Sequence, residues 1–435
     1  LRAFCKRTIA PPWSSILLVK NSAPRAALLF LFLLLISTPA LIAQIPKHGF
    51  VHTHSEQLFD GDDQPLLLRG INLGNWFEVE GYMFHFDGGP QSPREIEDLT
   101  KELLGPEKAD EFWRQWRANY ITEADLDRIK AMGFNSVRVP LHYKFFSSDD
   151  AEGFKLVDQL VDWAKKDGIY VILDMHCAPG GQTGTNIDDS YGYPWLYSSP
   201  EAQEETVAIW HRIAQHYHNN PTVLGYDLLN EPIPHFPQLR VFNRELEPVY
   251  WKIARGIRSV DRNHVLILGG AQWDTNFKVF GPPGDPNVMY TLHKYWTDKT
   301  DSSVIQEYLD FRHQYHVPIW LGESGENKDA WVEAFRKTLE ENHVGWAFWT
   351  YKRMDATPCV ATFDRPVHWD EIIALAKLPT GTGNAEKRIA ARPPQGDIDA
   401  AFADLLTKIQ FTHTRVNPTY VQALGMNPVS PLPAQ

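Results

Sequence analysis

Short runs of apolar residues alternate with longer amphipathic stretches along most of the chain. Eight apolar runs can be counted, at residues 65–74, 135–141, 170–176, 223–231, 264–270, 287–295, 317–324 and 344–352. They are rich in Val, Ile, Leu, Tyr and Trp, which is typical of strands buried on both faces. The sequence therefore predicts a sheet that is covered on both sides.

The stretches between these runs have the periodicity of amphipathic helices. The clearest are residues 122–133, 153–168, 201–218 and 329–342. Strands that alternate with helices predict a parallel sheet. Eight such units in about 300 residues favour an α/β fold of the closed (β/α)8 TIM-barrel type over an open sheet. The connection 271–286 lacks a helical pattern and is predicted to be a loop.

The chain continues beyond the eighth run with two further helical patterns. Residues 397–409 and 417–425 are predicted to be helices that close the floor of the barrel, and residues 379–396 between the barrel and these helices are predicted to be an exposed loop. No internal repeat or low-complexity linker interrupts the pattern. We therefore expect a single barrel domain at 44–425, followed by a C-terminal tail at 426–435.

The N-terminal segment carries a targeting pattern. Arg25 precedes a continuous apolar run, and small residues follow at Ala40 and Ala43. This order is typical of a secretory signal peptide, and the run is shorter than a membrane span requires. Residues 1–43 are predicted to be a signal peptide or an N-terminal anchor. The protein is accordingly expected to be secreted, periplasmic or attached to the cell surface.

Composition narrows the possible partners. The formal net charge of the 435 residues is −12, and the first 43 residues contribute five basic side chains and no acidic one. The remaining chain is therefore more acidic still, which argues against nucleic acid or an anionic membrane as a partner. Many of the 15 Trp and 16 Tyr side chains could stack on the C–H faces of a neutral sugar. We expect a monomer that contacts no lipid bilayer beyond the signal segment.

Metal and cofactor chemistry has little support in the sequence. Beyond the signal segment the cysteines are Cys177 and Cys359, and neither belongs to a C-x-x-C pair. Whether these two thiols pair is left open. His211, His216 and His218 are spaced five and two residues apart and do not share a helix face. We predict no metal and no cofactor.

Polar residues stand at the ends of the predicted strands. In a TIM barrel the carboxyl ends of the strands meet at one face, where catalytic residues lie. Burying ionisable groups together costs several kcal/mol unless they are paired, so their clustering indicates a function. The residues in question are Arg138, His176, Asn230, Glu231, His293, Tyr295, Glu323 and Trp349.

Glu231 and Glu323 suggest the chemistry of this face. Two carboxyl groups across one mouth are the minimum requirement for glycoside hydrolysis: one donates a proton and the other must be ionised. Arg138 and the Tyr295 hydroxyl are expected to hold a nearby carboxylate in its charged form. Pro232 is expected to end the fourth strand and to keep Glu231 extended.

From about residue 50 to 425 the chain resembles glycoside hydrolase family 5, the retaining β-glycanase barrels of the cellulase clan. The resemblance is carried by the motifs "SVRVP", "DMH", "NEP", "HKY", "LGES" and "FWTY" in this order. It implies that Glu231 is the acid/base and Glu323 the nucleophile. It also implies that Asn230 binds the 2-hydroxyl of the sugar and that the other strand-end residues bind substrate.

The substrate is expected to be a β-glucan or another β-linked saccharide. "NLGN" at 72–75 resembles endo-acting cellulases, and "DMHCAPGGQTG" at 174–184 resembles exo-glucanases. Four candidate platforms, Trp76, Trp195, Trp273 and Trp296, are spread over different loops, which favours an endo-β-1,4-glucanase with an open cleft. The insert 185–197, with Asp188 and Asp189, could instead build a wall against a terminal sugar. The alternatives are therefore an exo-β-1,3-glucanase or β-glucosidase, and a carbohydrate-binding barrel without catalysis.

Overall fold

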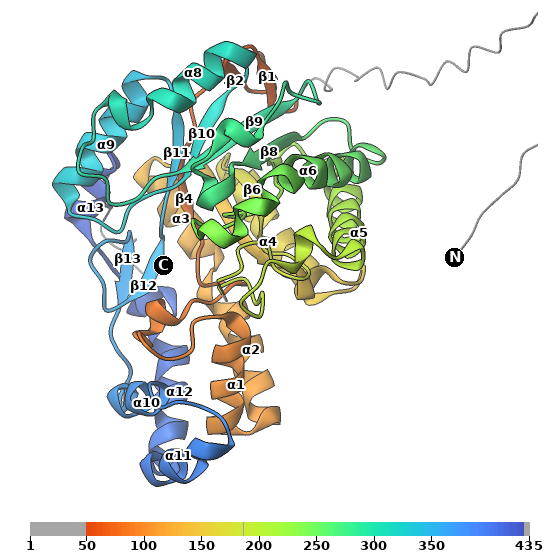
Figure 1. Ribbon diagram of the computed structural model, residues 1–435. Helices are drawn as coiled ribbons and strands as arrows, with labels where there is room; N and C mark the ends of the chain where they lie inside the picture. The colour runs from red at the N-terminus through yellow and green to blue at the C-terminus, as the bar shows by residue number, and fades with distance from the viewer. Residues whose placement is uncertain (1–48, 186, 430–435) are drawn as a thin grey trace, which may run out of the picture. The chain divides into compact units, whose positions relative to one another are not determined.

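The computed structural model describes residues 49–185 and 187–429, which lie within one compact unit, 43–435 (Figure 1). The predicted signal segment lies outside the described residues. In the part of the chain that is described, no helix combines the length and apolarity needed to cross a membrane. Cys177 and Cys359 are both buried and unpaired.

The centre of the fold is a closed barrel of eight parallel strands, as the sequence predicts. Each strand pairs with its neighbours in chain order, and the last pairs with the first. The strands are β4 (Arg69–Asn72), β5 (Ser136–His142), β6 (Tyr170–Cys177), β7 (Val223–Asp227), β8 (Val265–Gly269), β9 (Val288–His293), β10 (Ile319–Glu323) and β11 (Gly345–Phe348). The TIM-barrel prediction is confirmed.

Helices surround the barrel (Figure 1). Those between the strands are α1 (Pro93–Leu104), α2 (Pro106–Tyr120), α3 (Glu123–Met132), α4 (Glu152–Asp167), α5 (Pro200–Tyr217), α6 (Asn243–Arg258), α8 (Gln306–Tyr315) and α9 (Asp329–Glu341). The connection from β8 to β9 holds only α7 (Ala271–Asp274) and a 3₁₀ turn, in agreement with the predicted loop. After the barrel come α10 (Trp369–Ala376), α11 (Ala385–Ala391), α12 (Gln395–Lys408) and α13 (Pro418–Ala423).

Local sequence accounts for the ends of these helices. Ser92 and Glu95 form a capping box at the start of α1, and Pro93 occupies its first turn. α3 ends at Gly133, whose φ of 102° lies in the left-handed region that favours glycine. Such caps satisfy backbone groups that the helix itself leaves without partners.

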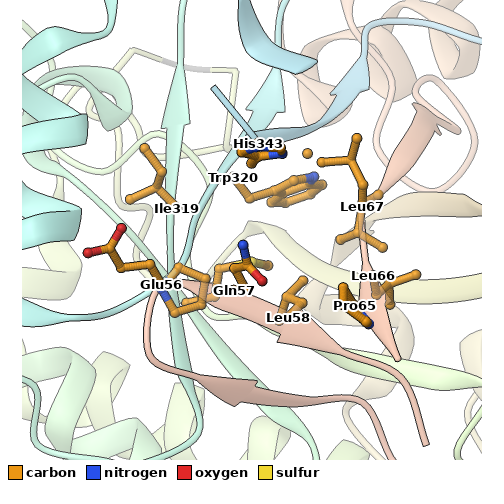
Figure 2. Close-up of a pocket in the computed structure, with 13 residues that line it drawn as sticks. Glu56, Gln57, Leu58, Pro65, Leu66, Leu67, Ile319, Trp320 and His343 are labelled. Atoms are coloured by element: carbon orange, nitrogen blue, oxygen red, sulfur yellow. The ribbon is translucent and has the colours of Figure 1, made fainter. Parts of the chain in front are cut away.

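The floor of the barrel is closed from the N-terminal side. β1 (His52–His54), β2 (Gln57–Phe59) and β3 (Pro65–Leu66) form an antiparallel sheet below the amino ends of the barrel strands. Leu58 packs in one cluster with Met289 and Trp320 of the barrel. A cavity of about 110 Å³ remains between this sheet and the barrel. Figure 2 shows residues that line it, among them Leu58, Trp320 and Glu56. The prediction that the C-terminal helices close the floor is therefore wrong.

The C-terminal helices pack on the outside instead. α12 contacts α1 and α2, and α13 contacts α9. The group α1, α2 and α10–α12 joins segments far apart in the sequence (Figure 1), and Arg388 of α11 pairs with Glu102 of α1 at 2.6 Å. Residues 379–396, predicted to be a loop, thus contain a helix. Within the predicted tail, Met426 is buried. A small sheet of β12 (Lys352–Met354), β13 (Ala361–Phe363) and β14 (Arg415–Val416) links this region to the barrel.

Candidate active site

A cleft of about 910 Å³ opens at the carboxyl ends of the barrel strands. Nine of the residues predicted from sequence line it, so the strand order brings together side chains from β6 to β11 and the loops that follow them. These nine are His176, Asn230, Glu231, Trp273, His293, Tyr295, Trp296, Glu323 and Trp349.

Glu323 is the last residue of β10 and is held from two sides. Its Oε1 accepts a hydrogen bond of 2.5 Å from Arg138 Nη1, and its Oε2 accepts one of 3.0 Å from the Tyr295 hydroxyl. The pairing register with β9 shifts between Leu321 and Glu323, an irregularity that re-aims a side chain. A Cβ on Gly322 would lie 2.3 Å from Thr291 Oγ1, so this position needs glycine. Donors on both oxygens fix the orientation of the carboxylate.

Arg138 does not reach the cleft. Its side chain is fully buried, and its guanidinium pairs with Asp174 at 3.1 Å and Asp227 at 2.8 Å as well as with Glu323. The expectation that Arg138 contacts substrate is therefore wrong. It orients Glu323 and, through a 2.9 Å bond to Oδ1, the Asn230 amide.

Glu231 lies beyond the end of its strand. β7 ends at Asp227, and Asn230 remains attached to β6 through its backbone N–H, which donates to Met175 at 3.0 Å. Glu231 has a φ of 45°, so the prediction of an extended residue before Pro232 is wrong. The turn is held by Asp274, whose Oδ2 accepts the Glu231 N–H at 3.1 Å. A non-glycine residue in this region of φ is costly and persists where its surroundings hold it.

His293 lies between the two carboxyl groups. Its Nδ1 is 3.0 Å from Glu231 and 3.7 Å from Glu323, and carboxylate oxygens of the two residues lie within 4.8 Å of each other. Burial lowers the pKa of His293 to about 3, so the ring is neutral near pH 7. Burial raises the pKa of Glu231, while His176 and Arg138 oppose that rise. The site therefore favours a proton on Glu231.

Asn230, His176 and Trp349 form the base of the cleft. The Asn230 Nδ2 lies 3.2 Å from His176 Nε2, and the His176 Nδ1 lies 2.8 Å from Asp174. The His176 ring stacks on Trp349 with centroids 5.7 Å apart. A Cβ on Gly74 would lie 2.4 Å from the Trp349 ring, which explains the glycine of "NLGN". An indole and an amide beside two carboxyl groups suit a sugar ring and its hydroxyls.

Two predicted platforms lie outside the cleft. Trp76 is 1% exposed, and its Nε1 donates to the Arg117 carbonyl at 2.7 Å. Trp195 is 49% exposed and contacts Tyr193, but it does not line the cleft. The assignment of Trp76 as a substrate-binding residue is therefore wrong, and that of Trp195 stays a prediction. An indole in a sequence does not reveal whether its ring faces the core, the solvent or the ligand.

The two aspartates of the insert 185–197 form hydrogen bonds within the protein. Asp188 accepts hydrogen bonds from the backbone N–H groups of Gln182 and Thr183. Asp189 lies 2.9 Å from His142 and accepts from the Arg94 N–H. Neither aspartate is available to bind a terminal sugar. The insert contributes Ile187 to the cleft instead.

Several cleft residues were not predicted. All of them except Lys294, which lies in the run 287–295, lie outside the apolar strand runs, although the "EVEGYMF" segment at 78–84 places two glutamates close to the first strand. They are Glu80, Tyr82, Thr185, Ile187, His235, Phe236, Thr275, Lys294, Thr297 and Glu326.

Among the described residues, two groups could offer three ligand atoms within 4.8 Å of one another. They are Glu78 with Glu80 and His176, and Glu231 with His293 and Glu323. The second group is the carboxyl pair itself, and a metal there would occupy the place of the sugar. The absence of a metal and of a cofactor stays a prediction.

Comparison with known proteins places the chain among carbohydrate-active proteins. A family model described as Cellulase (glycosyl hydrolase family 5) matches residues 100–355. A β-xylosidase from Phanerodontia chrysosporium is 30% identical over 256 residues, 57% of this chain and 52% of that protein. The chain thus spans about half the length of this relative.

Two other similar proteins are matched over most of their own length. Endoglucanase C from Acetivibrio thermocellus is 24% identical over 337 residues, 62% of this chain and 94% of that protein. The structure of a rutinosidase from Aspergillus niger has a TM-score of 0.53 at 19% identity and covers 66% of this chain and 90% of that one. At this identity the structural similarity concerns the fold alone.

Proposed function

The chain belongs to glycosyl hydrolase family 5, and from this membership we propose that it hydrolyses β-glycosidic bonds of β-glucans with retention of anomeric configuration. The main evidence for this proposal is that carboxylate oxygens of Glu231 and Glu323 lie within 4.8 Å of each other. Carboxyl groups about 5–5.5 Å apart are typical of retaining enzymes, whereas inverting enzymes need about 6.5–9.5 Å to admit a water molecule.

In the proposed reaction Glu323 attacks the anomeric carbon while Glu231 gives its proton to the departing oxygen. The bond between the sugar and its leaving group breaks, and a covalent bond to Glu323 forms. Glu231 then takes a proton from water, which attacks the same carbon and releases Glu323. The two donors on Glu323 and the burial of Glu231 support this division of roles.

The proposed mode of attack on the substrate differs from the first expectation. An endo-β-1,4-glucanase was favoured because four tryptophans were expected around the cleft. The two that line it, Trp273 and Trp296, follow neighbouring strands, β8 and β9, so these two tryptophans lie on one side of the mouth. This arrangement favours the alternative of an exo-acting β-glucanase or β-glucosidase, which we adopt. The linkage is left to product analysis.

Secretion is part of the proposal and rests on the sequence pattern of residues 1–43 alone. A barrel that only binds carbohydrate remains the rival from another class. Because such a protein need not keep two facing carboxyl groups, we expect release of reducing sugar from β-glucan. The absence of any release, with binding intact, would favour the rival.

Retention of configuration is the first testable outcome. The first product released from a β-glycoside should be the β-anomer, because two displacements at the anomeric carbon restore its configuration. Proton NMR of the anomeric region during the first minutes of reaction measures this directly. An α-anomer as the first product would exclude a nucleophilic role for Glu323.

The second testable outcome is the loss of activity at high pH, the basic limb of the pH–rate profile. Glu231 must carry a proton in the first step, so kcat/KM should fall as pH rises through its pKa. Because burial raises that pKa, the fall is expected at higher pH than an ordinary glutamate would give. With an activated aryl glycoside that needs no proton, the Glu231→Ala variant should lose this limb. A limb that persists in the variant would assign it to another group.

A further inference from the structure

Loops on one side of the cleft are tied together by their side chains. Arg353 of β12 pairs with Glu326, after β10, at 2.6 Å, and its guanidinium lies 4.6 Å from the centre of the Tyr82 ring. Tyr82, after β4, accepts a 2.7 Å hydrogen bond from Trp349 Nε1. Trp296, after β9, donates to the Glu326 carbonyl. Since β9, β10, β11 and β4 are consecutive in the barrel, these contacts link neighbouring loops along one part of the rim. We call Tyr82, Glu326 and Arg353 the side wall.

The opposite side of the cleft carries several apolar side chains. Ile187, Phe236 and Trp273 follow β6, β7 and β8, and Phe236 is 43% exposed. Glu231 also follows β7, whereas Glu323 ends β10 beside the wall. A leaving group protonated by Glu231 would therefore depart over the apolar side. The sugar bonded to Glu323 would lie against the wall.

Two carboxyl groups near the wall accept no hydrogen bond from the described residues. Glu80 lines the cleft and is 5% exposed, and its carboxylate interacts with the charge of Arg353. Glu78 is fully buried, and neither of its carboxylate oxygens has a hydrogen-bond partner among the described residues. Polar atoms of Glu78, Glu80 and His176 lie within 4.8 Å of one another. A buried carboxyl without a hydrogen-bond donor is costly, and sugar hydroxyls in the cleft would supply donors to Glu80.

The two carboxyl groups also suit a diol electrostatically. Burial, followed by the neighbouring charge of Glu80, raises the pKa of Glu78. Burial, followed by the charges of Glu323 and Glu326, raises the pKa of Glu80. Carboxyl groups that share a proton can both donate and accept hydrogen bonds. Adjacent hydroxyls of a sugar ring require both.

We propose that Glu80, supported by Glu78, binds hydroxyl groups of the non-reducing terminal sugar, and that the side wall stops the saccharide chain beyond this unit. The inference rests on the proposed glycosidase function and specifies it. The enzyme then releases one sugar unit at each event. Glu80 is a residue that determines specificity, because it recognises the end of the chain.

The product test uses hexasaccharides of β-1,4- and β-1,3-linked glucose tagged at the reducing end. The expected first products are free glucose and the tagged pentasaccharide. Arg353→Ala should open the wall and add shorter tagged fragments at early times. Arg365→Ala is the matched control, because Arg365 pairs with Asp355 and Asp370 on the surface and should leave the pattern unchanged. Shorter tagged fragments formed first by the unaltered protein would overturn the proposal.

The recognition test compares nitrophenyl β-glucoside with its 3-deoxy and 4-deoxy analogues. Glu80→Gln should lower kcat/KM on the parent glucoside by about 10- to 100-fold, the effect of weakening a charge-assisted hydrogen bond. With the unaltered protein, kcat/KM for at least one deoxy analogue should be lower than for the parent glucoside by a similar factor. With the Glu80→Gln variant, kcat/KM for that analogue should fall little further. Glu371→Gln, an exposed glutamate of α10, is the control. If both analogues lower kcat/KM, relative to the parent glucoside, by the same factor in the unaltered protein and in the variant, the role of Glu80 is overturned.

The proposed function can fail separately. If no glycoside is cleaved, that function is wrong, and glucose binding followed by tryptophan fluorescence tests Glu80 alone. Weaker binding of glucose by Glu80→Gln, by about tenfold or more, would support the site. Unchanged binding would overturn it.

Discussion

Replacement of Glu323 by alanine should lower kcat by about 10⁴-fold or more on every substrate, as in other deletions from a catalytic unit. The variant lacks the group proposed to bond to the anomeric carbon, so a good leaving group cannot compensate. The fold should survive, because Arg138 keeps Asp174 and Asp227 as buried partners. Rates on an activated and on an unactivated glycoside, together with the thermal unfolding midpoint, measure both effects.

Glu333→Ala is the matched control for this loss. Glu333 is an exposed glutamate of α9 that pairs with Lys337 on the helix surface. Its removal should leave kcat within about twofold, since surface changes of this kind alter little. A Glu323→Ala variant that is folded and still turns over an activated glycoside would contradict the nucleophilic role.

Replacement of Glu231 by alanine should give a different pattern. Hydrolysis of a glycoside with a poor leaving group should fall by about 10²- to 10⁴-fold, the usual contribution of a general acid. A dinitrophenyl glycoside should still form the glycosyl-enzyme, because its leaving group needs no proton. The second step should then be slow, since no base activates water. A burst of dinitrophenol followed by slow turnover is the expected observation.

Reaction with added azide further distinguishes the proposed roles of the two glutamates. It needs no general base, so it should accelerate the second step of Glu231→Ala and yield a β-glycosyl azide. With Glu323→Ala any azide product should be the α-anomer, because azide then attacks once from the vacated face. NMR of the products distinguishes the two. The opposite assignment of anomers would exchange the proposed roles of Glu231 and Glu323.

Much of the site was visible in the sequence for a local reason. His176, Asn230, Glu231, His293 and Glu323 each follow an apolar run, and parallel strands in a barrel bring such positions to one face. The positions of the strands are therefore sufficient to predict that these residues lie close together. Their hydrogen bonds did not need to be known.

The errors share a different cause. Trp76 is of a residue type that stacks on sugars, yet its ring packs in the core. Glu80 and Glu326 were missed because loops carry no periodicity that shows where a side chain points. Arg138 was placed in contact with substrate because its aspartate partners lie in β6 and β7, far along the chain.

The sequence by itself determined the barrel, the order of its strands and the face on which the carboxyl groups meet. These follow from apolar periodicity and from the obligatory pairing of strands, which are properties of short segments. Only the tertiary structure decided the floor formed by β1–β3, the side wall and the buried position of Glu78 and Glu80. Those features depend on contacts between residues far apart in the chain, such as Tyr82 with Arg353 and Trp349. Packing and side-chain hydrogen bonding choose such contacts among many, and no local pattern encodes them.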